Sequence, residues 1–403
     1  MKRPEITRRA LIKRAALLGG AIAGLPLFSP ITFAATPGDR RLVVMILRGG
    51  MDGLDVLQPI GDPLYARARP TLRSPAKPLT DFYALHDGLA DLRPLWDAGE
   101  LGFAQAVATP YRDKRSHFEG QDLLEAGTGM DVAINAVKDG WLNRLLQTMP
   151  GVTSETAYVV GQGEMKILSG PAPAAIWSPR TTLPLGPETS RLIERIYMDD
   201  PLFQAAVIQA LDLANSVEDG KQAGGGAMAM DQMSNASRSK ADRALAAFAA
   251  DRLNRETRIA AFSLNGWDTH RAQTYPLTVA LNRLADTILT LKAGLGANWG
   301  RTAVLAMTEF GRSVRENGNR GTDHGTGGMM LLAGGAIRGG RVYGDWPGLA
   351  SNALYSNRDL MPTADVRAYA GWALAALFGV DRHSLETKIF PGLDLGGDPR
   401  FVR

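Results

Sequence analysis

Cysteine is missing from the sequence of 403 residues. The protein therefore contains no disulfide, no thiolate-bound iron–sulfur cluster, no c-type haem attachment and no cysteine-based zinc site. A chain of this length can bury a large core without disulfides. Any metal ion that it binds must be held by oxygen and nitrogen ligands.

Long hydrophobic runs and a large excess of one charge are missing as well. No stretch approaches the 18 or more apolar residues typical of a membrane-spanning helix, so we expect no stable membrane span in the mature chain. The net charge is +4, but residues 1–35 contain six Lys and Arg side chains and one Glu, which leaves the rest close to neutral. This balance argues against nucleic acid as a partner.

The amino-terminal segment is typical of an export signal. Arg8 and Arg9 precede a short apolar run, residues 15–28, that glycines and a proline interrupt, and residues 32–35 offer small side chains to a signal peptidase. The arginine pair favours the twin-arginine pathway, with a Sec signal or an uncleaved anchor as alternatives. We predict that residues 1–35 are a twin-arginine signal peptide, that the twin-arginine translocase is a partner during export, and that the protein acts in the periplasm or outside the cell.

Continuous apolar runs alternate with helix-like patterns along the remaining chain. Apolar spacings of three and four residues predict helices over 277–295 and 364–378. Runs that predict strands buried on both faces cover residues 42–47, 103–107, 158–160, 259–264, 303–307 and 329–332. This alternation predicts an α/β fold with a mainly parallel central sheet.

Residues 36–403 are predicted to form one domain. A segment rich in Gly, Ser, Met and Lys, residues 220–241, indicates a flexible insertion at the surface. Strand patterns continue on both sides of this segment, which favours a single domain over two.

Polar residues follow several predicted strands, the place where ligands bind in open α/β sheets. Asp52 lies in a glycine-rich turn after the first strand, and Glu309 and Arg312 follow the strand 303–307. A Gly-Asp-Gly sequence also forms common turns, so the first motif alone is weak. The position of these side chains nevertheless indicates a site at the carboxyl edge of the sheet.

The segment around Ser116 permits two compatible interpretations. Ser116 and Glu119 form a capping box that predicts a helix start, and Gly127 is a suitable residue to follow its end. The same place suits a nucleophilic hydroxyl, because the amides and dipole of a helix start favour an anion. Arg115 adds positive charge beside it.

Three of the five histidines lie beside acidic residues in polar loops next to predicted strands: His117, His270 and His324. A lone loop histidine is usually a surface residue. Three beside carboxylates, after predicted strands, indicate a metal site. His86 and His383 lack this setting, and we interpret them as structural.

These segments together resemble the family called domain of unknown function 1501. The resemblance covers essentially the whole mature chain and rests on the arginine pair and on five motifs: Arg-Gly-Gly-Met-Asp-Gly-Leu (48–54), Arg-Ser-His-Phe (115–118), Gly-Trp-Asp-Thr-His (266–270), Thr-Glu-Phe-Gly-Arg (308–312) and Asp-His-Gly (323–325). The family is similar to the alkaline phosphatase and sulfatase superfamily. That similarity implies a three-layer sandwich and a hydrolase or transferase of phosphate or sulfate esters with two divalent metals. Members are often encoded beside a second uncharacterised family, which implies an envelope protein partner.

The superfamily pattern implies ligands for two divalent ions (Zn, Mn, Mg or Ca). One ion would be held by Asp268, His270 and His324. The second would be held by Asp52, Glu309 and Ser116. Where the superfamily has a histidine after the carboxylate at 309, this chain has Phe310, and Asp323 is the nearest replacement.

The resemblance also implies an in-line displacement on a phosphate ester. Ser116 would be the nucleophile, with its neighbour His117 as the next catalytic residue, and Arg115 or Arg312 would neutralise the phosphoryl oxygens. Phosphate is favoured over sulfate because Ser116 lacks the sequence context of sulfatase nucleophiles. The alternative is a non-catalytic envelope scaffold or assembly factor that retains the fold, which the missing imidazole at Phe310 supports.

Overall fold

The computed structural model describes residues 32–34, 39–72, 74–133, 136–149, 152, 165–173, 227–255 and 257–403. The predicted strand at 158–160 and nearly all of the predicted signal segment lie outside the described residues. No helix among those that the structure describes has the length and apolar character needed to cross a membrane.

The central sheet has eight strands and is mainly parallel, as the sequence predicts. Its order is β1 (Thr32–Ala34), β7 (Ile259–Asn265), β2 (Arg41–Arg48), β8 (Thr302–Met307), β9 (Gly328–Ala333), β6 (Leu101–Ala108) and β10 (Val342–Tyr343), with β11 (Ala364–Asp365) also paired to β6. Strands β1 and β9 run antiparallel to their neighbours. A smaller antiparallel sheet has the order β3 (Leu57–Gln58), β5 (Ala84–His86) and β4 (Ala76–Pro78).

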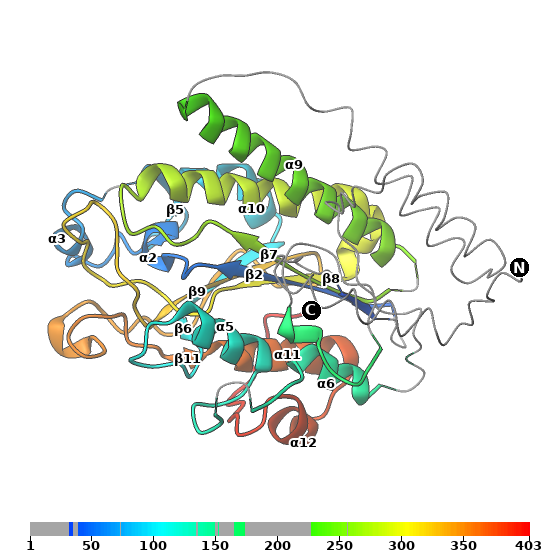
Figure 1. Cartoon of the computed structure of the whole chain (residues 1–403). Coiled ribbons are helices and arrows are strands. Elements are labelled where there is room, and N and C mark those ends of the chain that lie inside the picture. The colour runs from blue at the N-terminus through cyan, green and yellow to red at the C-terminus, as the bar shows by residue number, and fades with distance from the viewer. Residues whose placement is uncertain are drawn as a thin grey trace, which may run out of the picture.

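The long strands of the central sheet are mainly apolar because helices cover both faces of the sheet (Figure 1). Along β2, alternate side chains enter two different cores: Val43, Met45 and Leu47 on one face, and Leu42, Val44 and Ile46 on the other. All six are fully buried. The continuous apolar runs of the sequence are thus explained by a three-layer arrangement.

One helical layer contains η2 (Asp87–Leu92), α4 (Arg93–Asp97), α9 (Ala227–Leu253), α10 (Thr274–Leu295) and η6 (Gly296–Arg301). The opposite layer contains α5 (His117–Ala126), α6 (Trp141–Gln147), η4 (Lys166–Leu168), α11 (Val366–Phe378), α12 (Arg382–Ser384) and η8 (Leu385–Ile389). Short helices α2 (Gly53–Val56), α3 (Tyr65–Ala68) and η7 (Ser351–Ala353) lie in connections. The helices predicted at 277–295 and 364–378 are confirmed as α10 and α11.

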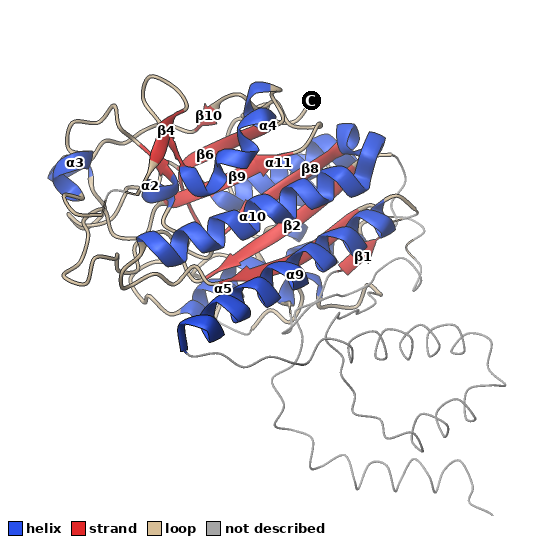
Figure 2. Cartoon of the chain, turned by 90° about the horizontal axis from the view of Figure 1, so that it is seen from above, coloured by secondary structure: helices blue, strands red, loops and turns tan. Residues whose placement is uncertain are grey.

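Helix α9 corrects the prediction of a flexible insertion over residues 220–241, because residues 227–241 are helical. Its first half contains three Ala and three Met residues, which are strong helix formers. Its second half packs on α10 through buried Leu245, Ala246 and Ala249 (Figure 2). Residues 220–226 lie outside the described residues.

The antiparallel direction of β9 matters for the site. Parallel strands β2, β7 and β8 bring their carboxyl ends to one edge of the sheet, and β9 begins at that edge because it runs the opposite way. The loops that follow β2, β7 and β8 and the loop that precedes β9 therefore meet there. These loops contain most of the predicted site residues.

Candidate metal centre

Three histidines and one aspartate converge at this edge. The Asp268 Oδ1 atom lies 3.0 Å from His270 Nε2 and 3.2 Å from His324 Nε2, and the two Nε2 atoms are 2.9 Å apart. The Asp268 Oδ2 atom lies 3.5 Å from His117 Nε2. Ligand atoms of His117, Asp268 and His324 all lie within 4.8 Å of one another, so these three residues could hold a metal ion. The structure thus joins the predicted Asp268, His270 and His324 and adds His117.

Helix α5 places His117, its first residue. The Ser116 Oγ atom accepts a hydrogen bond from the Glu119 N–H at 3.4 Å, and Gly127 ends the helix in the left-handed region with φ of 67°. The helix cap at Ser116 and the glycine stop predicted from the sequence are confirmed, whereas the return hydrogen bond of a capping box, from the Ser116 N–H to the Glu119 carboxylate, is not formed. Ser116 also donates its own N–H to Tyr111 Oη at 2.7 Å, which fixes the chain directly before the histidine.

Hydrogen bonds behind the imidazole rings decide which nitrogen faces the centre. The Nδ1 atom of His117 lies 2.8 Å from Glu309 Oε1, and that of His324 lies 3.0 Å from the Arg115 carbonyl oxygen. Both partners accept, so each Nδ1 carries a proton and each Nε2 offers its lone pair to the centre. Metal-bound histidines in proteins are held in this way.

One atom at the centre lacks a partner. His117 Nε2 is buried and has no hydrogen bond. Buried polar atoms in folded proteins almost always have a partner. A divalent cation beside Asp268 would supply one, and two imidazole nitrogens with one carboxylate form a donor set that suits zinc or manganese. The residues present therefore fit a metal ion.

Glu309 holds the imidazole ring of His117 by a hydrogen bond on its buried side. The Glu309 carboxylate is buried and accepts hydrogen bonds from the Gly49 N–H (2.9 Å), Gln121 Nε2 (3.1 Å) and His117 Nδ1 (2.8 Å). Burial alone would raise the pKa of Glu309, but these donors outweigh it and lower the pKa. The hydrogen bond to Glu309 in turn raises the pKa of His117. Glu309 thus orients a ligand, and Gln121 joins it although nothing in the sequence marks it.

Arg312 supports Asp268 in the same manner. Its guanidinium is buried and donates to Asp268 Oδ1 at 2.6 Å, to the carbonyls of Gly49 and Gly50 at 2.5 Å each, and to that of Thr322 at 3.0 Å. Partial burial favours a higher pKa for Asp268, but Arg312 outweighs it and lowers this pKa to about 2. Arg312 therefore joins three loops to one another instead of facing solvent.

Phe310 lies where the superfamily pattern has an imidazole. Its ring is buried, with its centroid 5.1 Å from that of His117 and 4.8 Å from that of His324. Desolvation at this apolar wall is consistent with the lowered pKa of His324, whose first cause is burial. Phe310, at the position where the resemblance implies a ligand, thus packs against the rings of His117 and His324, two candidate ligands.

Asp52 lies in different surroundings from Glu309. Arg69 binds the Asp52 carboxylate with both nitrogens of its fork, at 2.7 and 2.9 Å, and Gln273 Nε2 donates to it at 2.6 Å. All three side chains are buried. Asp52 and Glu309, which the resemblance implies as ligands of a second ion, are thus each held by other partners in the described residues.

The loops that hold the histidines carry exposed charged side chains of both signs. Lys114, Arg115, Arg271 and Arg320 are exposed in the loops that hold the histidines. Asp323, also exposed, lies with its Oδ1 atom 3.6 Å from His270 Nδ1 and accepts from Asn317 at 3.1 Å.

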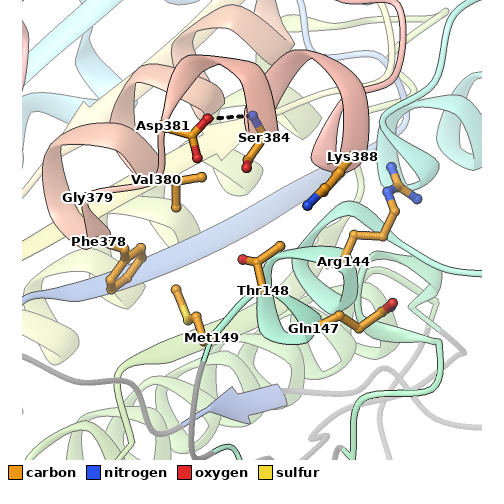
Figure 3. A pocket seen from close by; sticks show the side chains of 10 residues that line it. All are labelled: Arg144, Gln147, Thr148, Met149, Phe378, Gly379, Val380, Asp381, Ser384 and Lys388. Carbon is orange, nitrogen blue, oxygen red and sulfur yellow. Dashed lines mark hydrogen bonds between the residues drawn. The ribbon is translucent and has the colours of Figure 1, made fainter.

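A cavity of about 700 Å³ opens elsewhere, between the ends of α6 and α11 (Figure 3). Helix α11 begins beside the carboxyl end of β6, so its last residue, Phe378, lies toward the opposite edge of the sheet. Arg144 lines this cavity but is engaged with backbone carbonyls, including that of Ile389. None of the predicted site residues lines it.

A family profile matches residues 116–383, which span the centre from His117 to His324. Its description is "Protein of unknown function (DUF1501)". The chain belongs to this family. Comparisons with curated proteins and with solved structures gave no match.

Proposed function

We propose that this family member is a metal-dependent hydrolase of phosphate esters. The observation that carries the proposal is the convergence of His117, Asp268 and His324, with an unpartnered nitrogen on His117. Three protein ligands leave a position open, as catalytic sites do, whereas structural sites usually have four. A divalent ion bound there supplies Lewis acidity for an ester oxygen and a nearby hydroxyl. The nitrogen-rich ligand set favours zinc or manganese over magnesium and calcium.

His270 is the proposed general acid. Its side chain is half-buried, its Nε2 atom lies within 3.0 Å of Asp268 and its Nδ1 atom faces Asp323 at 3.6 Å. An imidazole backed by a carboxylate and open to solvent can protonate a leaving oxygen. His324 cannot do so, because its Nε2 lone pair points into the centre.

Ser116 is the proposed nucleophile. Its hydroxyl lies at the amino end of α5, directly before His117, and accepts only a long hydrogen bond of 3.4 Å. The hydroxyl loses its proton to solvent, its Oγ attacks phosphorus and the alcohol leaves with a proton from His270. Water then cleaves the Oγ–phosphorus bond. The helix amides and the side chain of Arg115 favour the phosphoryl group beside Ser116.

The predicted superfamily relation, export pathway and protein partner are part of this proposal. A mainly parallel sheet between helices, with a site at its carboxyl edge, supports the relation to alkaline phosphatases. Export through the twin-arginine pathway and an envelope protein partner are proposed from the sequence. Cleavage after Ala34 would remove β1 from the sheet, because β1 consists of residues 32–34 and pairs with β7.

Metal analysis and hydrolysis of 4-nitrophenyl phosphate test the function together. We expect one bound divalent ion, and turnover of the phosphate exceeding that of 4-nitrophenyl sulfate. His324→Ala should lose the ion and the turnover. His270→Gln should keep the ion and lose turnover about 100-fold or more, the usual contribution of a general acid. The control is His383→Ala, because His383 is an exposed histidine that is distant in sequence from the residues of the centre. A wild-type protein that binds no ion and cleaves neither ester would contradict the proposal.

A non-catalytic scaffold is the second candidate, and one observation favours it. The Nε2 atom of His270 lies 2.9 Å from that of His324, close enough to act as a fourth ligand. Four protein ligands would close the site and make the metal structural. Loss of metal from His270→Gln, together with an inactive wild type, would support this alternative.

Export has its own test. Replacing Arg8 and Arg9 together with Lys should retain the precursor in the cytoplasm, because the receptor of the pathway recognises the arginine pair. Fractionation with immunoblotting measures this outcome. Normal recovery of the double variant from the periplasm would instead indicate a Sec signal.

A further inference from the structure

A groove of about 400 Å³ adjoins the metal centre. Its lining includes Phe118, Gln121, Lys138 and Lys166. Phe118 and Gln121 lie in α5, the helix that begins with His117, and Gln121 also donates to the buried Glu309 at 3.1 Å. A substrate whose phosphoryl group lies at the centre can therefore extend its organic part into the groove.

Phe118 gives the groove an apolar wall. Its side chain is 90% exposed, whereas the other exposed large apolar side chains among the described residues reach at most the 57% of Tyr275. Phe118 also follows His117 directly in the chain. A phenylalanine left almost fully in water gives up the stabilisation of burial, so a bound ligand that covers it gains that stabilisation.

One cation of the groove is unengaged. Arg48 donates to Glu125 at 2.5 Å, and Lys166 donates to Asp122 at 2.6 Å. Lys138 is exposed and forms no ion pair with any residue that the structure describes. Its ammonium group can therefore pair with a negative charge on a ligand.

We propose that this groove selects the alcohol part of the ester, which carries a flat apolar group against Phe118 and a second negative charge facing Lys138. The proposal rests on the proposed function of the adjoining centre. An aryl phosphate with a carboxylate on its ring has this chemistry. Esters of small alcohols would bind only at the centre.

Binding of phosphonates tests the groove without turnover, because their carbon–phosphorus bond is not an ester bond. Calorimetry on the full chain with added zinc would compare methylphosphonate, phenylphosphonate and 3-carboxyphenylphosphonate. We expect phenylphosphonate to bind about fivefold more tightly than methylphosphonate, and Phe118→Ala to remove this preference while leaving methylphosphonate unchanged. Lys138→Gln should weaken the carboxylated ligand about threefold and leave phenylphosphonate unchanged.

Tyr275→Ala removes another exposed aromatic side chain and should change none of these affinities. Equal binding of methyl- and phenylphosphonate by the wild type, no binding of either, or equal losses in Phe118→Ala and Tyr275→Ala would overturn the proposal. Selective binding by a protein that cleaves no phosphate ester would support the groove and contradict only the proposed hydrolase. If the wild type cleaves a phosphate ester but Phe118→Ala does not change phosphonate binding, the proposed hydrolase is supported and the groove is contradicted.

Discussion

The ring orientation of His117 depends on a single carboxylate. Because Glu309 accepts from Nδ1, the opposite nitrogen is the one that faces Asp268. Glu309 follows the end of β8, whereas His117 begins α5. A shorter side chain at position 309 would not reach the His117 ring. Carboxylates behind metal-bound histidines also raise ligand basicity. Glu309, which the resemblance implies as a ligand of a second ion, thus orients a histidine of the candidate centre.

His86 should make the protein sensitive to acid. It is fully buried, its Nδ1 atom accepts from the Gly88 N–H at 2.9 Å, and burial lowers its pKa from 6.5 to about 4. Between pH 6.5 and 4, His86 binds a proton in the unfolded chain but not in the folded chain. The free energy of unfolding therefore decreases as the pH falls from 6.5 toward 4. The loss should be roughly 3 kcal/mol.

The variant His86→Asn checks this expectation. Asparagine can accept the Gly88 N–H at the same cap position and does not titrate. Urea unfolding at several pH values should therefore give a shallower acid-side loss for the variant than for the wild type. Parallel pH profiles of the two proteins would assign the acid sensitivity to other groups.

Ser116 has two roles that substitutions can separate. As a helix cap alone, Ser116→Ala costs about 1 kcal/mol and Ser116→Asp is nearly harmless, because aspartate caps equally well. As a nucleophile, its loss in either variant abolishes turnover while the metal stays bound. We expect inactive variants with wild-type metal content and, for Ser116→Asp, a wild-type melting temperature. Full activity of Ser116→Asp would make the residue purely structural.

At the scale of elements, sequence patterns were most informative where they reflect local chemistry. The apolar runs predicted five described strands because both faces of the sheet are covered. Ser116 and Gly127 predicted the two ends of α5 because capping acts within one turn. The helix over 227–241 was missed, since its composition suggested a loop.

Contacts between distant residues were beyond the sequence. Gln273 donates to Asp52 across 221 positions, and His117 meets Glu309 across 192. Nothing local indicates that Arg69, at the end of α3, would neutralise Asp52. The histidines and Asp268 could be predicted as a cluster because each follows or precedes a strand at the same edge, but their individual roles could not.

The ion pair between α3 and the turn after β2 should be a strong local determinant of stability. Arg69→Met would leave the buried Asp52 carboxylate without its cation, which typically costs about 3–5 kcal/mol. Denaturant unfolding measures this change. Adding Asp52→Asn to Arg69→Met should recover part of the loss, because the charge that lacks a partner is gone. Equal stability of the single and double variants would show that the charge is not the cause.

At the scale of the whole molecule, the centre joins segments that are distant in the chain. His117 comes from α5, Asp268 from the loop after β7, and His324 from the loop before β9. These loops come together only when the sheet has formed. An unfolded chain cannot present the same three ligands, so metal affinity is coupled to folding.

Metal should therefore stabilise the whole protein through this one centre. An ion that binds only the folded state adds about 4 kcal/mol at a free concentration 1,000 times its Kd, which should raise the Tm by several degrees. Calorimetry of the chelator-treated chain, before and after addition of zinc or manganese, measures the shift. His324→Ala should abolish it, because the Nε2 ligand is lost, whereas the surface variant His383→Ala should retain it. An equal rise of Tm in His324→Ala and the wild type would place the ion elsewhere in the molecule.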